Sequence, residues 1–185
     1  APARNEEIPT YMRRPRILPG MVAAALAAAP LGASPATAAD PKAIGTFSDW
    51  QAVTFDDGGS TGCYITSRPT KEEGDYTQRG RTYVLVTHRP KDGSFDVVSI
   101  VAGYTYKDGS DVTVAIDQKD FSLFTHQDSA WAADTATDRA LVAAMKSGNR
   151  MVVRGISSRG TKTTDTYSLS GFTKAYNAIA EACPR

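Results

Sequence analysis

The residues best suited to metal or acid–base chemistry in this chain are its two histidines, His88 and His126. Three aspartates, Asp117, Asp120 and Asp128, lie close to the second histidine in sequence. A zinc or copper site requires the fold to bring both histidines together with a carboxylate. The competing hypothesis is that both are merely exposed side chains at strand ends. The alternative function that the sequence allows is therefore a metal-dependent or hydrolytic enzyme using His88 and His126.

Two adjacent serines, Ser157 and Ser158, are the candidates for a nucleophile. They lie in the run GISSRG, residues 155–160. The nucleophile elbow of hydrolases requires G-x-S-x-G at a strand-to-helix turn. Arg159 stands in the place of the second glycine, so the run predicts a hydrated hairpin loop instead.

The same loop offers groups that bind anions. Arg154, Arg159 and Lys162 lie among hydroxyl-bearing residues and glycines. Guanidinium and ammonium groups in such a setting bind phosphate or carboxylate. We therefore treat these three side chains as candidate contacts for an anionic ligand or a partner.

Several aromatic side chains are candidates for a carbohydrate or protein contact surface, because exposed aromatic rings often anchor partners. They are Trp50, Tyr64, Tyr104, Tyr106 and Trp131. Among them, the two tryptophans are retained as candidate partner contacts. Core packing is the competing role of both, since tryptophan rings bury a large apolar area in small β domains.

The two cysteines, Cys63 and Cys183, are 120 positions apart. Redox-active cysteines usually form a close C-x-x-C pair, which this chain lacks, so the sequence predicts a structural disulfide if the protein is exported. Closing so long a loop stabilises a fold by roughly 4–5 kcal/mol in the chain-entropy model. The bond would pin the C-terminal helix to the early strands.

The last third of the chain predicts two strands, Met151–Ile156 and Asp165–Leu169, followed by a helix. The apolar residues of that helix fall on one face, because their spacing follows the helical period. They are Phe172, Ala175, Tyr176, Ile179 and Cys183. Ser170 is the expected N-cap, and Pro184 ends the helix.

The preceding residues predict short strands separated by turn signals about every ten residues. The expected strands are Phe47–Phe55, either as one strand or as a bent one, and Cys63–Thr66, Thr82–His88, Phe95–Ala102, Tyr104–Tyr106, Asp111–Ile116 and Phe121–Thr125. Asp138–Lys146 predicts a short helix with Gly148 as its C-cap, whereas Ala39–Gly45 predicts a linker and Lys71–Arg81 a solvated loop. The fold class is therefore all-β or β-dominated α+β: an antiparallel sandwich or curled sheet with one internal and one C-terminal helix.

Residues 1–38 have the pattern of a signal peptide with an upstream leader. Met12–Arg16 is basic, Ile17–Leu31 is apolar, and Ala36–Ala38 is an A-x-A cleavage site. Residues 39–185 are then expected to form a single domain. This part carries 17 basic and 18 acidic residues, so it lacks the excess of basic charge typical of nucleic-acid-binding proteins.

Many short stretches spread over residues 45–183 resemble the invasion-associated locus B family in their order and spacing. They are GTFSDWQ (45–51), Cys63-Tyr64, Arg68-Pro69, VTHRP (86–90), 104–114, 121–125 with Trp131, 145–148, 155–158, YSLSGF (167–172) and Cys183. The resemblance implies a small exported bacterial envelope protein, periplasmic or associated with the outer membrane, without an established catalytic activity.

The function predicted from these observations is non-catalytic. We expect an exported binding or scaffold module of the periplasm or outer membrane, or a secreted protein that takes part in host-cell interaction and virulence. Its partner would be an envelope or host protein or component, not nucleic acid. No catalytic residue, metal or cofactor is predicted, and no membrane-spanning segment is expected in the mature chain.

Overall fold

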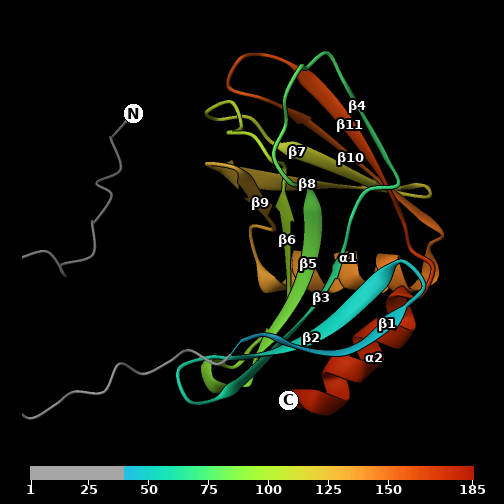
Figure 1. Ribbon diagram of the computed structural model, residues 1–185. Helices are drawn as coiled ribbons and strands as arrows, with labels where there is room; N and C mark the ends of the chain where they lie inside the picture. Colours follow the sequence, from blue (N-terminus) through green and yellow to red (C-terminus); the bar gives the residue numbers. More distant parts are fainter. Residues whose placement is uncertain (1–39) are drawn as a thin grey trace, which may run out of the picture. The chain divides into compact units, whose positions relative to one another are not determined.

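The computed structural model describes residues 40–185, which form one open antiparallel sheet and two α-helices (Figure 1). The signal peptide predicted over residues 1–38 lies outside the described residues. The strands are β1 (Lys42–Phe47), β2 (Trp50–Asp56), β3 (Thr61–Ser67), β4 (Lys71–Gly74), β5 (Tyr83–Arg89), β6 (Ser94–Val101), β7 (Val112–Ile116), β8 (Lys119–His126), β9 (Ser129–Trp131), β10 (Arg150–Ile156) and β11 (Lys162–Ser168). The helices are α1 (Thr135–Ser147) and α2 (Phe172–Ala182), and a 3-10 turn, η1 (Pro90–Asp92), joins β5 to β6.

The sheet runs in the order β1-β2-β3-β5-β6-β9-β8-β7-β10-β11-β4. Strand β8 makes it continuous, because it pairs with β9 at one end and with β7 along most of its length. Figure 1 shows the resulting strong curl. The prediction of a β-dominated fold with a curled sheet, an internal helix and a C-terminal helix is confirmed.

Both helices contribute to a single core against one face of the sheet. Helix α2 packs on β1, β2 and β3, and α1 packs on β6 and β8. Trp50 shows how tightly this layer closes: its ring meets Phe172 edge-on at 4.8 Å, and its indole N–H donates to the Ser168 carbonyl at 3.0 Å. Alternate residues of the strands face away from the helices and form an open face.

The helix ends follow local chemistry, with one correction. Helix α1 begins earlier than predicted because the Asp134 carboxylate accepts a hydrogen bond from the Thr137 N–H at 2.7 Å, and it ends at Gly148 as predicted. The predicted N-cap of α2, Ser170, is wrong, because Gly171 holds that position with a φ of 88°. A Cβ there would lie 1.8 Å from the Phe47 carbonyl oxygen, so the position requires glycine.

Four sequence-based assignments are wrong. The expected strand Tyr104–Tyr106 is not a strand, because only Tyr106 forms an isolated bridge, to Ser157. The segment expected to be a linker, Ala39–Gly45, supplies most of edge strand β1. The expected strand Phe47–Phe55 is split by a turn at Ser48, whose φ is 51°. The expected loop Lys71–Arg81 contains edge strand β4, which pairs with β11. The edge strands β1 and β4 are each stabilised by pairing with one adjacent strand, and their sequences show little alternation of apolar and polar residues.

The predicted disulfide is confirmed. Cys63 of β3 and Cys183 at the end of α2 are bonded, with their Cα atoms 6.1 Å apart. Both side chains are buried, so the bond lies within the core. It fixes the last turn of α2 to the third strand of the sheet.

Candidate functional site

A groove of about 1160 Å³ lies on the open face of strands β2, β3 and β5. Its walls combine aromatic, aliphatic and hydroxyl side chains with three arginines. They include Phe55, Tyr64, Thr66, Tyr83, Leu85, Thr87, Arg68, Arg81 and Arg89. Strand periodicity explains this composition, because residues two apart share a face and the intervening residues, such as Val84 and Val86, are buried beneath the helices.

The register of the sheet extends this face beyond the groove. Leu85 pairs with Ser99, and Ser99 pairs with Trp131 on β9. The Trp131 ring in turn lies 5.9 Å from that of Phe124, which is 47% exposed. Trp131, predicted as a contact residue, therefore lies on the same open face as the groove.

Two of the three groove arginines have no carboxylate partner among residues 40–185. Arg89 is bound to Asp57 at 2.8 Å and lies over the Phe55 ring. Arg68 and Arg81 are exposed and form no ion pair within this range. They give the groove positive charge that a partner could neutralise.

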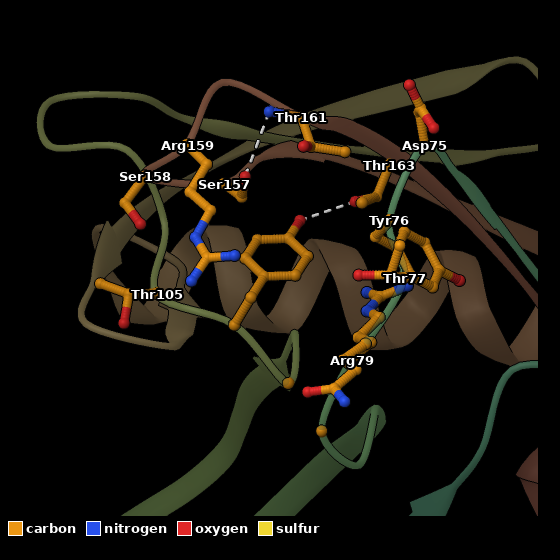
Figure 2. Close-up of a pocket in the computed structure, with 14 residues that line it drawn as sticks. Asp75, Tyr76, Thr77, Arg79, Thr105, Ser157, Ser158, Arg159, Thr161 and Thr163 are labelled. Atoms are coloured by element: carbon orange, nitrogen blue, oxygen red, sulfur yellow. Dashed lines mark hydrogen bonds between the residues drawn. The ribbon is translucent and has the colours of Figure 1, made fainter.

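A second concave region, a cavity of about 910 Å³, lies beside the turn between β10 and β11 (Figure 2). One wall is that turn, the opposite wall is the segment 75–80, and the segment 103–105 joins them. Gly80 and Gly103 bring the last two segments into backbone contact, with the Gly80 N–H donating to the Gly103 carbonyl at 2.8 Å. A Cβ on Gly103, whose φ is 72°, would lie 2.5 Å from the Gly80 carbonyl oxygen.

Arg79 fixes the wall formed by 75–80. Its guanidinium donates to both carboxylate oxygens of Asp165, at 2.6 and 2.7 Å, and to the Ala102 carbonyl at 2.7 Å. It also lies over the rings of Tyr104 and Tyr76, 5.0 and 5.5 Å from their centroids. Burial alone would lower the pKa of Arg79, but the hydrogen bonds and charge of Asp165 outweigh it and raise that pKa. Arg79 is therefore a charged, fully engaged structural group.

Tyr104 forms the floor of the cavity. Its hydroxyl shares a 2.6 Å hydrogen bond with Thr163, drawn as a dashed line to that labelled residue in Figure 2. Burial raises the pKa of Tyr104, so the ring stays neutral near pH 7. A Cβ on Gly155 would lie 2.9 Å from this hydroxyl and 2.7 Å from the Tyr106 ring. Glycine at that position makes room for both tyrosines.

The structure separates the three basic residues predicted to receive an anion. Arg159 lines the cavity, and Figure 2 shows its side chain reaching from the turn into it. Arg154 and Lys162 are exposed and alternate along their strands with Gly155, which is buried against Tyr104 and Tyr106, and with Thr163, which lines the cavity. They therefore lie on the opposite face of the β10–β11 hairpin and do not converge with Arg159.

His88 is not the exposed strand-end residue that one hypothesis expected, since it is 1% exposed. Its Nε2 lies 3.2 Å from one carboxylate oxygen of Asp96. That oxygen also accepts a hydrogen bond from the Tyr176 hydroxyl at 2.5 Å, and the other oxygen accepts one from Arg185. Burial would raise the pKa of Asp96, but the bonds from His88 and Tyr176 and the charge of Arg185 together lower it. The cluster ties α2 and the last residue to β5 and β6.

His126 is exposed at the end of β8 and pairs with Ser129. Ser129 pairs in turn with Val101, the last residue of β6, whereas Asp96, the neighbour of His88, lies near the start of that strand. The two histidines therefore do not converge. No three His, Cys, Asp or Glu side chains of residues 40–185 form a group that could hold a metal ion. Ser157 accepts a hydrogen bond from the Thr161 N–H at 3.1 Å and makes none with a histidine of this range.

The structure places the aromatic residues predicted as partner contacts in three different environments. Trp50 is fully buried and Tyr106 is 3% exposed, so both belong to the core, which was the competing role for Trp50. Tyr64 lines the groove, whereas Tyr104 lines the cavity.

The sequence analysis did not predict the other residues that line the groove and the cavity. For two of the groove residues the sequence does contain a usable pattern. The alternation in TYVLVTH, residues 82–88, could have placed Tyr83 and Leu85 together on one face of a strand. Nothing local marks Arg79 or Asp165, which are 86 positions apart and lie in polar segments.

A family model described as "Invasion associated locus B (IalB) protein" matches residues 50–180. The chain belongs to the invasion-associated locus B family. The match runs from β2 into α2 and so covers most of both the groove and the cavity. The locus B family is one of envelope proteins and is not known as an enzyme family. Searches of the curated proteins and of the solved structures each returned no match.

In residues 40–185 of this locus B family member, neither helix has the length and apolar character needed to cross a bilayer.

Proposed function

We propose that this protein is an exported, non-catalytic binding module of the cell envelope that holds a partner protein on the open face of its sheet. The observation that carries the proposal is the groove over β2, β3 and β5, where tyrosine, phenylalanine and leucine side chains lie between arginines. Tyrosine, tryptophan and arginine are the residue types that dominate the energetics of protein interfaces. The groove supplies two of these types, and the adjoining β9 supplies Trp131.

The charges indicate the chemistry of the partner segment. Arg68 and Arg81 are exposed and have no carboxylate partner within residues 40–185. Tyr83 and Leu85 lie in the same groove and offer apolar surface. The partner segment that fits carries apolar or aromatic side chains flanked by aspartate or glutamate, because paired charges fix register and increase the association rate.

Location outside the cytoplasm is part of the proposal. The disulfide between Cys63 and Cys183 supports it, because such bonds persist in oxidising compartments. The signal peptide predicted at the start of the chain agrees with export. The family description makes host-cell contact a further setting for the same surface. Fractionation of cells and medium distinguishes a protein of the periplasm, the outer membrane or the medium.

The experiment is photocrosslinking in cells at matched positions on opposite faces. A photoreactive residue replaces Leu85 in the groove in one variant and Asn177, exposed on α2, in the other. We expect one defined protein adduct from the groove position and none from the helix position. Adducts of equal yield from both faces, or none from the groove, would contradict the proposal.

Charge reversal then tests the electrostatic component. Arg68→Glu with Arg81→Glu should reduce the yield of the Leu85 adduct by about tenfold or more, since charge-assisted hydrogen bonds contribute about 1.5–3 kcal/mol each. The matched control is Arg139→Glu with Arg150→Glu, two exposed arginines outside the groove. An equal loss in both double variants would show that net charge alone is responsible.

A further inference from the structure

The cavity beside the β10–β11 turn is a concave region separate from the groove. Its volume of about 910 Å³ is far larger than an inorganic phosphate or sulfate needs and falls within the range of small-molecule sites. None of its lining residues lines the groove. This volume accommodates a sugar ring or a molecule of comparable size.

The cavity walls carry polar groups that the fold leaves unused. The hydroxyls of four lining residues make no hydrogen bond through their side chains within residues 40–185. They are Thr77, Thr105, Ser158 and Thr161. Figure 2 shows them on both sides of the cavity, with Thr77 on the wall opposite Ser158. A hydroxyl can both donate and accept a hydrogen bond, so this set suits a ligand that is itself rich in hydroxyls.

The floor adds an aromatic surface. Tyr104 is held by its bond to Thr163 and by the Arg79 guanidinium, which lies 5.0 Å from its ring centroid. Its position is therefore fixed before any ligand arrives. The faces of aromatic rings carry negative charge density, and the C–H groups of a sugar ring are weakly positive. A pyranose ring and a fixed tyrosine are complementary for this reason.

One basic side chain of the cavity suits an anionic group on the ligand. The positive charge of Arg79 is balanced by Asp165 and also by Glu72, whose carboxylate lies 3.6 Å from the guanidinium. Arg159 forms no ion pair within residues 40–185, and its side chain reaches into the cavity. Asp75 also lines the cavity and stands near the upper edge of the view in Figure 2. Arg159 is thus the basic group available inside, and its planar fork matches a carboxylate.

We propose that this cavity binds an acidic sugar: a pyranose ring over Tyr104 with its carboxylate on Arg159 and its hydroxyls on the threonine and serine side chains. The same chemistry occurs in cell-wall sugars, in sialic acids of host surfaces and in uronic acids. One site could take any of these, so the probes must separate them.

The test measures binding of three acidic probes to the full protein by NMR titration or calorimetry: N-acetylmuramic acid, N-acetylneuraminic acid and glucuronic acid. The methyl ester of each acid is its neutral control. We expect at least one acid to bind and its ester to bind about tenfold or more weakly, because the charged bond to the guanidinium is lost. The acid that binds most tightly identifies the source. Binding of no acid, or equal binding of acid and ester, would overturn the proposal.

The hairpin itself supplies the matched variants. Arg159→Gln should weaken binding of the preferred acid by about 10- to 100-fold, whereas Arg154→Gln, on the opposite face of the same hairpin, should leave it unchanged. Both arginines are exposed, so neither change should disturb folding. Equal losses in both variants would show that the acid is attracted by overall charge. Failure here leaves the groove adduct of Leu85 unaffected, so the two proposals stand or fall separately.

Discussion

Two buried aspartates of this protein, Asp165 and Asp96, are each 4% exposed or less and are stabilised in different ways. Asp165 is bound at both oxygens by one arginine, Arg79, whose side chain is itself 3% exposed. Asp96 receives bonds from His88, Tyr176 and the C-terminal residue, Arg185, whose side chain is 56% exposed. We call Arg79 and Asp165 the closed pair, because both side chains are buried, although Arg79 also lies 3.6 Å from the more exposed Glu72. The bonds to Asp96 are shared among several elements.

The backbone explains the second arrangement. The pairing of β5 with β6 shifts between Thr87 and Arg89, so two residues of β6 lie opposite one of β5. Asp96 lies in this bulge with a φ of 64°, a conformation that aspartate tolerates better than most residues. The bulge leaves Asp96 buried beside His88, where helix α2 can also reach it. Thus a buried carboxylate can hold a loop through one strong partner or a chain end through several weaker ones.

The largest effect should follow from breaking the closed pair. Arg79→Met leaves the Asp165 carboxylate buried without its counter-charge, which should lower the free energy of unfolding by about 3–5 kcal/mol. Urea unfolding measures the loss. Arg81→Met, an exposed neighbour, is the control and should change stability by about 0.5 kcal/mol or less. A loss no larger than that of the control would mean that Asp165 is well solvated.

A smaller, pH-dependent effect should follow from changing the shared carboxylate. Asp96→Asn should cost about 1–3 kcal/mol of unfolding free energy at pH 7, because hydrogen bonds to a charged acceptor are weakened. The pKa of Asp96 is lower in the folded protein than its ordinary value of 3.8. The carboxylate therefore adds stability above about pH 4, and this contribution is lost as the pH falls through the folded pKa.

The measurement is the free energy of unfolding of the wild type and of Asp96→Asn from pH 7 down to pH 3. The difference between them should be constant above about pH 4 and should shrink below it. Asp108→Asn, at an exposed turn, is the control and should show a small difference throughout. A difference that grows as the pH falls would contradict the sign of the pKa shift.

The smallest effect should come from Arg185→Ala. Its side chain is more than half exposed, so its ion pair with Asp96 is screened by water and should contribute about 0.2–1 kcal/mol. Thermal unfolding at low and high salt measures it, and the loss should be smaller in 1 M NaCl. A loss as large as that of Arg79→Met would show that the two aspartates depend equally on their arginines.

Predictions from the sequence succeeded where the pattern was local and strong. The alternation of Val112, Val114 and Ile116 and the apolar face of the C-terminal helix gave the right elements and the fold class. The spacing of Cys63 and Cys183 excluded a close redox pair and left the disulfide that the fold forms. The N-cap of α2 was misplaced by one residue, because the approach of Phe47 to Gly171 involves residues far apart in sequence.

The candidate sites were predicted less well, because the chain assembles them from distant segments. Arg159 was identified from its loop, but its separation from Arg154 and Lys162 depends on which face each strand residue takes, which requires the exact register. The burial of His88 beside Asp96 depends on the bulge at Phe95 and Asp96. Neither residue type is specific to bulges, so the sequence gives no sign of it. The composition of one polar segment does not show which distant residue will pair with it, as for Arg79 and Asp165.

The disulfide has a mechanical consequence. Cys63 and Cys183 enclose β4 through β11, α1 and all of α2, whereas β1, β2 and the start of β3 are the elements of residues 40–185 that precede Cys63. A pulling force applied between Asp40 and Arg185 would pass through the sulfur–sulfur bond. It could extend the residues before Cys63 and the two after Cys183, but the enclosed strands would carry no tension. The groove strand β5 and the cavity therefore lie outside the segment on which such a load pulls directly.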